Sequence, residues 1–506
     1  MECPHQTPKS KIRQFWISLT HSAFVIGLLS LVWFVLRTGT KPTRAAYPCQ
    51  RAAAASSTAW LAAYVVPFLP FVRVLKERKW DRRAAVGVLV SLVAVAGITW
   101  VALQPNVGST GDGGTSFPVA LTLPKIRSSS PMASDLFVVQ GVTPEDSGIP
   151  DLISLMSANG VRFYRSEDSG IGRSPDGLID ADDVVLIKVN CQWDQRGGTN
   201  TDLVRALISA IVDHPSGFTG EIVIADNGQA QYGSRGSGGS LNWSRNNAEA
   251  RTQSIQDVVS GFATEHVVST FLWDTITGTR VDEYDQQDME DGYVVQDVAD
   301  SPSGMAVTYP KFETSHGTYV SFKCGIWDPA SASYDSTRLK VINLPVLKPH
   351  MIYGVTGCVK HYMGVVSDRL SSSAGTRAHN AVTTGGMGTA LAETRFPTLN
   401  ILDAIHVCLE PGQGPMVYYT DTTHLGIVAA STDPVALDYW AATYILIPGA
   451  EQRGHAANTF SPDLSRPFPG SFARYLDASR EILQQSGFRV TSDEDTMNVF
   501  VTLNES

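Results

Sequence analysis

The chain has 506 residues, enough for more than one domain, and a formal net charge of −10 at pH 7. Residues 1–103 hold 13 Lys or Arg against 3 Asp or Glu, whereas the remainder holds 26 against 46. The acidic remainder lacks the basic face that neutralises phosphates, so the composition argues against a nucleic-acid binder and predicts no nucleic-acid partner.

Three uncharged apolar stretches near the N-terminus, residues 15–36, 52–72 and 84–103, are typical of transmembrane helices. Each has about 20 residues, the length that crosses a bilayer core. Lys and Arg gather in the N-terminal tail and in the loop between the second and third stretches. This distribution predicts a multi-pass membrane protein with its N-terminus inside and its C-terminal part outside the cytoplasm. If the second stretch is not inserted, the C-terminal part lies on the other side.

Two connecting segments have distinct compositions. Residues 38–50 form a polar loop that contains Cys49, either a plain membrane-surface turn or a redox or partner contact through that thiol. Residues 104–135 are rich in Gly, Ser, Thr and Pro, which indicates a linker. The composition therefore predicts a transmembrane region over 1–103, a linker over 104–135 and an α/β domain over 136–506.

Strand and helix patterns alternate after the linker. Continuous apolar runs predict buried strands over 183–190, 220–228 and 266–274, and the segments between them predict helices over 199–214 and 246–263. Thr199 with Asp202 resembles a cap for the first helix. This order predicts a parallel sheet built from right-handed βαβ units.

The same alternation continues toward the C-terminus. Strands are expected over 338–347, 398–404 and 425–432, and a helix over 378–394. Further helices are expected over 433–446, where Asp433 would be the N-cap before Pro434, and over 473–486. The predicted fold class is α/β, a mostly parallel sheet with flanking helices, preceded by about three transmembrane α-helices.

Polar side chains follow the predicted strands, where open α/β sheets bind their ligands. They are Lys188, Asn190, Asp226, Asn227, Lys348, His350, Asp403 and Asp433. We expect these side chains to line a ligand site at the carboxyl edge of the sheet, with Asp433 serving alternatively as a helix cap alone.

The segment 343–364 places Lys348 and His350 before a glycine-spaced turn and Lys360 after it. Gly354 and Gly357 would let the backbone turn tightly, and a helix starting near Thr356 would present free N–H groups to an anion. Lys348 and Lys360 would add positive charge, and His350 would transfer protons, with Asp403 as a further catalytic residue. The alternative is a strand-turn-helix with incidental Lys and His.

A metal site is the rival interpretation. His350, His361 and His379, with Asp226 and Asp403, are ligand types that the fold could bring together, although none shows ligand spacing. No two of the six cysteines form a C-x-x-C pair, so no local zinc or iron–sulfur motif is present and the cofactor is unknown. Nucleotide-binding glycine patterns and a G-x-S-x-G elbow are also absent.

Seven segments, taken in order, resemble the DUF362 family of uncharacterised proteins: DDVVLIKVN, TNTDLVRALI, IVIADNG, VINLPVLKPHMIYGVTGCVKHYMG, LNILDAI, GQGP and GIVAASTDPVALD. The resemblance spans roughly residues 150–447. It implies the α/β domain. Family members are often described as iron–sulfur-associated because many carry a ferredoxin-type cysteine cluster. This sequence departs from that pattern, since Cys191, Cys324, Cys358 and Cys408 are scattered.

Two functional hypotheses follow. The first is a membrane-anchored extracytoplasmic enzyme that acts on an anionic small molecule or cofactor, with redox chemistry as one option and the reaction unknown. The second is a non-catalytic module that binds a ligand or partner at the membrane surface. An enzyme should bring the named side chains together in one pocket with shifted pKa values.

Overall fold

The computed structural model describes residues 31–32 and 119–504, apart from 144–145, 169, 230–237, 250, 297–302 and 375. In this part of the chain no helix combines the length and apolar composition that a bilayer crossing requires. The three apolar stretches expected to span a membrane lie outside the described residues except for 31–32. Residues Phe117–Ser506 form one compact unit, to which the following description applies.

An eight-stranded sheet is the centre of this unit. Its strands, in spatial order, are β18 (Met497–Leu503), β1 (Ser134–Gln140), β17 (Thr422–Ser431), β16 (Leu399–Cys408), β13 (Leu339–Asn343), β4 (Val184–Lys188), β5 (Glu221–Asp226) and β6 (Val268–Leu272). Only β17 runs antiparallel to its neighbours. The expected mostly parallel sheet is confirmed.

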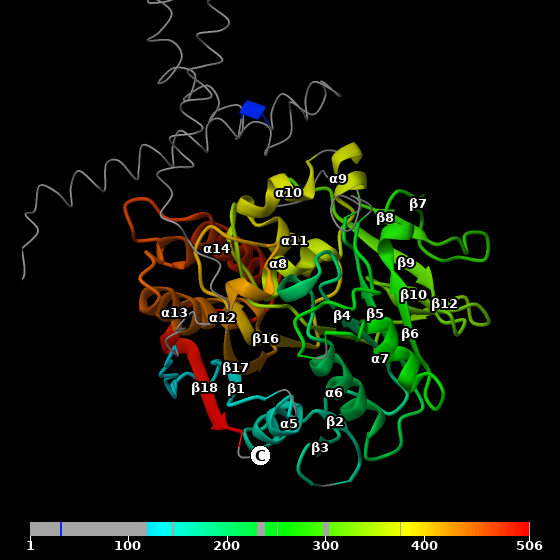
Figure 1. Ribbon diagram of the computed structural model, residues 1–506. Helices are drawn as coiled ribbons and strands as arrows, with labels where there is room; N and C mark the ends of the chain where they lie inside the picture. Colours follow the sequence, from blue (N-terminus) through cyan, green and yellow to red (C-terminus); the bar gives the residue numbers. More distant parts are fainter. Residues whose placement is uncertain are drawn as a thin grey trace, which may run out of the picture. The chain divides into compact units, whose positions relative to one another are not determined.

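Helices cover both faces of the sheet because its strands are apolar on both sides (Figure 1). One face packs on α5 (Ile149–Ala158), α6 (Thr201–Val212) and α7 (Ile255–Phe262), and the other on α8 (Cys358–His361), α11 (Gly386–Glu393), α12 (Pro434–Ala441) and α14 (Ser471–Gln485). In β4, Leu186 joins the core under the second group of helices, whereas Val185 and Ile187 join the core under the first. This alternation follows from the period of two in a strand.

Caps set the starts of two helices later than the sequence indicated. Asn200, not Thr199, caps α6, and its side chain accepts hydrogen bonds from Asp202 N and Leu203 N at 2.9 and 3.3 Å. Thr199 Oγ1 instead accepts from Asn190 N at 2.6 Å. The helix expected over 246–263 begins only at Ile255, where Ser254 and Asp257 form a capping box.

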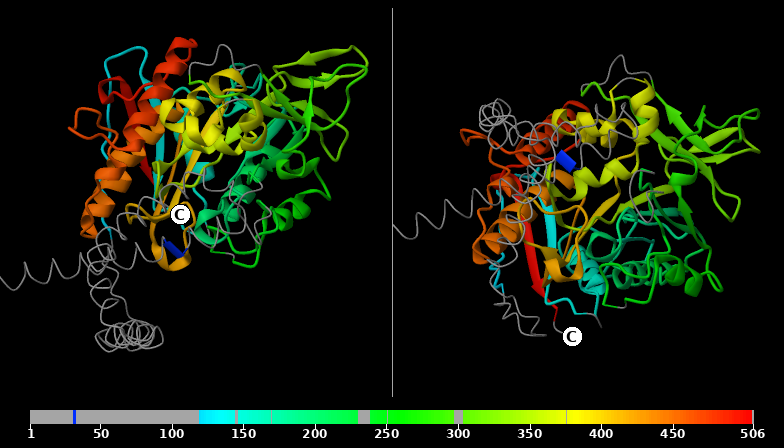
Figure 2. Two further views of the ribbon diagram at one scale, coloured as in Figure 1. Left: turned by 90° about the horizontal axis from the view of Figure 1, so that it is seen from above. Right: turned by 45° about the horizontal axis from the view of Figure 1, so that its top comes forward.

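A second, six-stranded sheet was not predicted. It contains, in spatial order, β12 (Ser333–Asp335), β11 (Gly325–Asp328), β10 (Tyr319–Ser321), β9 (Thr308–Glu313), β8 (Gly292–Val295) and β7 (Arg280–Val281). Both views of Figure 2 show it, in green, on the side of the main sheet away from red β18. Its strands have two to six residues, too short for a clear alternation. Glu283 ties them together by accepting hydrogen bonds from Tyr309, Ser321 and Tyr334.

The last part of the expected linker packs on the domain. Ile126 exchanges backbone hydrogen bonds with Val499 of β18 at 3.3 and 2.9 Å, and Leu123 is buried in the core. The composition of residues 104–135 indicated a linker and gave no sign of this pairing.

Short elements complete the unit. They are the hairpin of β14 (Lys348–His350) and β15 (Gly354–Thr356), the pair β2 (Tyr164–Arg165) and β3 (Arg173–Ser174), and the helices α9 (Asp368–Ala374), α10 (Ala378–Ala381) and α13 (Ile447–Gln452).

Candidate functional site

The carboxyl ends of β4 and β5 hold a buried ion pair. Lys188 Nζ lies 2.7 Å from Asp226 Oδ1, and the two side chains are 1% and 3% exposed. Burial lowers the pKa of Lys188, which Asp226 opposes. A Cβ on Gly364 would lie 2.3 Å from Asp226 Oδ1, so the backbone reaches this pair only because residue 364 is glycine.

Two further lysines, Lys348 and Lys360, are near enough to Lys188 for their charges to interact with it. Lys348, in β14, is 2% exposed and its Nζ donates a hydrogen bond to Gly197 O. Lys360, in α8, is 6% exposed and its Nζ lies 5.0 Å from the centre of the Tyr353 ring. Together with Lys188 they form what we call the lysine cluster. Three buried ammonium groups with one ion-paired carboxylate among the described residues make this a region of excess positive charge.

The pKa values of these lysines are low for two physical reasons. Burial, and then repulsion from Lys360, lower the pKa of Lys348 to about 7. Burial, and then repulsion from Lys188, lower the pKa of Lys360 to about 8. Both groups therefore exchange protons near neutral pH, which an ordinary lysine does not.

Asp403 lies beside the segment that leads into β14, since Leu347 N donates to Asp403 O at 2.8 Å. Its carboxylate is buried and accepts hydrogen bonds from Asn247 Nδ2 at 2.8 Å and from Ile405 N at 3.2 Å. Burial raises the pKa of Asp403 to about 6. Its charge in turn favours the protonated form of Lys348.

His350 is held in one tautomer. Its Nδ1 accepts hydrogen bonds from Ile352 N at 3.1 Å and Tyr353 N at 3.3 Å, so the ring proton is on Nε2. Burial and the nearby Lys360 lower the pKa of His350 below its usual range. A ring whose lone pair is already used is poorly suited to accept a proton. This geometry leaves the Nε2–H group of His350 as a hydrogen-bond donor.

The N-terminus of α8, which the sequence suggested as an anion site, already holds a carboxylate. Asp438 of α12 accepts from Cys358 N at 2.5 Å and from Val359 N at 2.9 Å. A Cβ on Gly357 would lie 2.2 Å from Asp438 Oδ1, so this glycine admits the cap and not an external ligand. Burial raises the pKa of Asp438 to about 7. No signal in the sequence linked residue 438 to residue 357.

Several other residues predicted to bind ligand have structural partners. Gly354 has φ +78° and packs against Thr459 O, where a Cβ would lie at 2.3 Å. Thr356 is paired with Lys348 across the hairpin. Asn190 Oδ1 accepts from Val346 N at 3.1 Å, which joins the end of β4 to the segment before β14. Asn227 Nδ2 donates to Tyr293 Oη at 2.7 Å and so links the two sheets.

Asp433 lies away from the lysine cluster. It follows β17, and Ser431 at the end of that strand lies in the same row of the sheet as Lys188, separated from it by β16 and β13. Its carboxylate caps α12 through Val435 N and Ala436 N at 2.8 and 3.0 Å and also accepts from Ser134 Oγ and Thr491 N. The sequence could not show that two strands, β16 and β13, separate β17 from β4.

The histidines proposed as metal ligands do not converge. His361 directs Nδ1 to Asn343 Oδ1 at 2.7 Å and Nε2 to Val189 O at 2.9 Å. His379 Nδ1 lies 2.8 Å from Asp368 Oδ1. Among the residues that the structure describes, no three His, Cys, Asp or Glu side chains are grouped to hold a metal ion.

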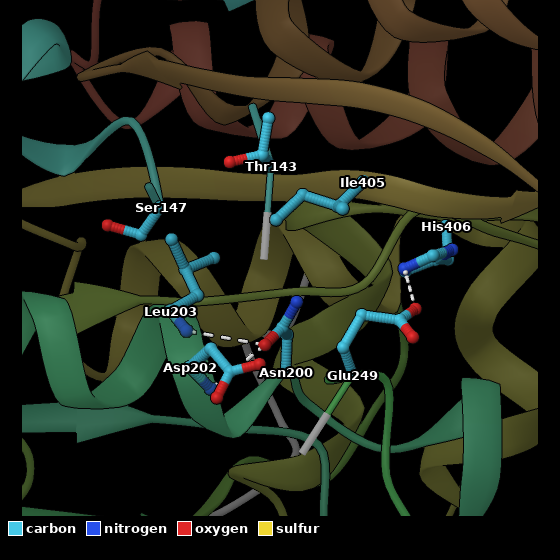
Figure 3. A pocket seen from close by; sticks show the side chains of 8 residues that line it. All are labelled: Thr143, Ser147, Asn200, Asp202, Leu203, Glu249, Ile405 and His406. Carbon is cyan, nitrogen blue, oxygen red and sulfur yellow. Dashed lines mark hydrogen bonds and ion pairs between the residues drawn. The ribbon is translucent and has the colours of Figure 1, made fainter. Parts of the chain in front are cut away.

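A second polar cluster was missed. Glu249 Oε1 lies 3.0 Å from Arg196 Nη2 and 2.8 Å from His406 Nε2. Glu249 and His406 line a cavity of about 10 Å³ with Asn200 and Thr143, among others (Figure 3). That volume is enough for about one water molecule. The three residues come from distant segments with no shared motif, so nothing in the sequence connected them.

One comparison with known proteins gives a match to part of the chain. Residues 313–443 match the family model described as Domain of unknown function (DUF362). The matched segment is narrower than the resemblance seen over 150–447. It contains Lys348, His350, Lys360 and Asp403, whereas Lys188 and Asp226 precede it. No curated protein matches the chain.

Proposed function

We propose that the lysine cluster binds an anionic small molecule or cofactor. The observation that carries this proposal is the burial of Lys348 and Lys360, neither of which has an ion-paired carboxylate among the described residues. Burying an ammonium group without a counter-charge is costly, and a fold retains such a group when another function depends on it. A bound anion would supply the missing charge.

The edge of the sheet supports the same proposal. β4, β5 and β13 run parallel, so Lys188, Asp226 and the segment leading to Lys348 meet at their carboxyl ends. This is where ligands bind in open α/β sheets. His350 Nε2–H would be a neutral donor to the anion, beside the charged lysines.

We further propose an enzyme in which Lys348 transfers a proton. A pKa of about 7 lets this amine act as an acid or a base at neutral pH, with Asp403 tuning its charge. A non-catalytic binding module is the alternative, and it would need the anion site without turnover. Redox chemistry draws no support from the described cysteines, Cys191, Cys324, Cys358 and Cys408, which form no cluster.

Calorimetric titration of the purified full chain with inorganic phosphate at pH 6.5 tests the binding site. We expect Lys360→Met to weaken phosphate binding at least tenfold, because one charge contact to the anion is lost. The matched control is Lys125→Met, which removes the same charge from an exposed position. Equal affinities in the two variants would refute the lysine cluster as the anion site.

We also propose that residues 1–103 anchor the protein in a membrane with the α/β domain outside the cytoplasm. The support is the length of the three apolar stretches and the placement of Lys and Arg around them.

A further inference from the structure

Four large apolar side chains are exposed beside the lysine cluster. Met351 and Ile352, in the turn between β14 and β15, are 67% and 50% exposed. Met416 and Tyr418, in the segment between β16 and β17, are each 43% exposed. We call these four residues the apolar rim.

Backbone contacts connect both parts of the rim to the cluster. Met351 N donates to Gly414 O at 3.3 Å, which holds the turn against the segment that carries Met416. Ile352 N donates to His350 Nδ1. The rim therefore continues directly from His350.

The second segment also reaches the Lys348 ammonium. A Cβ on Gly197 would lie 3.1 Å from Pro415 O, so Gly197 and Pro415 are in close contact. Gly197 O is the acceptor of the hydrogen bond from Lys348 Nζ. A short series of contacts, from Lys348 through Gly197 to Pro415, therefore connects a buried ammonium group to the residue next to exposed Met416.

We infer that the ligand is an amphiphilic anion, with its charged group on the lysine cluster and a hydrocarbon chain on the apolar rim. This inference rests on the proposed function, because the cluster must first bind an anion. Charge complementarity fixes the orientation, since the ammonium groups are the buried end and the apolar side chains the exposed end. Methionine suits such a surface because its flexible thioether adapts to a chain of variable shape.

Chain length is the direct test. We would titrate the full chain, held in discs of zwitterionic phosphatidylcholine, with inorganic phosphate and with ethyl, butyl and hexyl phosphate, and subtract the signal of empty discs. Each methylene that leaves water should strengthen binding about two- to fourfold. Hexyl phosphate should therefore bind at least tenfold more tightly than ethyl phosphate.

The double variant Met351→Ser/Met416→Ser should reduce this gain severalfold, because it removes two of the four rim side chains, and leave inorganic phosphate binding unchanged. Met132→Ser is the matched control, because Met132 is an exposed methionine outside the rim, 53% exposed. Circular dichroism of each variant would verify that the fold is kept.

The outcomes separate this inference from the proposed function. If inorganic phosphate fails to bind, the proposed function is wrong. If phosphate binds but all chain lengths bind equally, the amphiphile is wrong and the anion site stands. If the double variant loses binding to vesicles of anionic lipid but keeps the gain with hexyl phosphate, the rim is a membrane contact and the inference is overturned.

Discussion

At the scale of single residues, the buried ammonium group of Lys360 lowers the free energy of unfolding of the protein. Its pKa is about 8 in the folded chain, below that of an unfolded lysine, so the unfolded state binds more protons between about pH 8 and pH 10.5. This reduction is therefore full below pH 8 and disappears as the pH rises toward 10.5. We predict that Lys360→Met stabilises the ligand-free protein by ~3 kcal/mol at pH 6.

Thermal unfolding at several pH values would measure this effect. The variant should melt a few degrees above the parent chain at pH 6, and the difference should shrink toward zero near pH 10. A variant that is less stable at pH 6 would show that Lys360 has a stabilising partner.

We predict that anion binding depends on pH through the protonation of Lys348. The amine attracts an anion only when protonated, and its pKa is about 7. The dissociation constant for sulfate, whose own charge does not change in this range, should stay nearly constant below pH 6.5. It should then rise toward tenfold per pH unit near pH 7.5, and more steeply above pH 8, where Lys360 also loses its proton. In Lys348→Met the binding should be weaker at pH 6.5, and its decline should begin only near pH 8, where Lys360 loses its proton. An unchanged profile in this variant would remove Lys348 from the site.

At the scale of elements, the start of α8 depends on a glycine and a buried carboxylate. A methyl group at residue 357 would lie 2.2 Å from Asp438 Oδ1, so Gly357→Ala must displace either the cap or the helix. We predict a loss of ~2–3 kcal/mol, as for other overpacked cores. Gly261→Ala is the control, because its Cβ would meet no atom within 4 Å and alanine favours the helix. Denaturant unfolding of both variants is the measurement, and equal stabilities would contradict the tight fit at Gly357.

The elements also show which parts of the fold the sequence could predict. Strands β4, β5 and β6 were predicted because a long apolar run bounded by turn residues has few other solutions. The second sheet was not predicted, because its short strands gain their stability from partners distant in sequence, such as the Tyr309 and Tyr334 hydroxyls on Glu283. The secondary-structure propensities of neighbouring residues do not depend on such distant contacts, so they cannot predict them.

Some residues of the candidate site could likewise be predicted from the sequence, and others could not. The direction of a strand decides which end of the sheet a residue occupies. The parallel order predicted from the sequence therefore brings Lys188 and Asp226 to the same edge as the segment leading to Lys348. Asp433 instead caps α12, with two strands between β17 and β4, and Asp438 of α12 occupies the N-terminus of α8. Sequence patterns therefore predict which polar residues lie at the carboxyl edge of the sheet. They do not predict which of these residues are already hydrogen-bonded to other parts of the protein, because those partners are distant in sequence.

At the scale of the whole molecule, the remaining prediction concerns the side of the membrane on which the α/β domain lies. Two arrangements follow from the sequence: three inserted stretches put the domain outside the cytoplasm, whereas loss of the stretch 52–72 puts it inside. We predict that an epitope tag at the C-terminus is reached by antibody in intact cells, and that a tag at the N-terminus is reached only after permeabilisation. The protein should also stay with membranes after an alkaline wash.

Replacing Leu61 and Val65 by Arg, in the middle of the stretch 52–72, should make its insertion costly and move the C-terminal tag to the protected side. A C-terminal tag that is protected already in the parent chain would mean that an even number of stretches is inserted, and the ligand of the lysine cluster would then be a cytoplasmic anion.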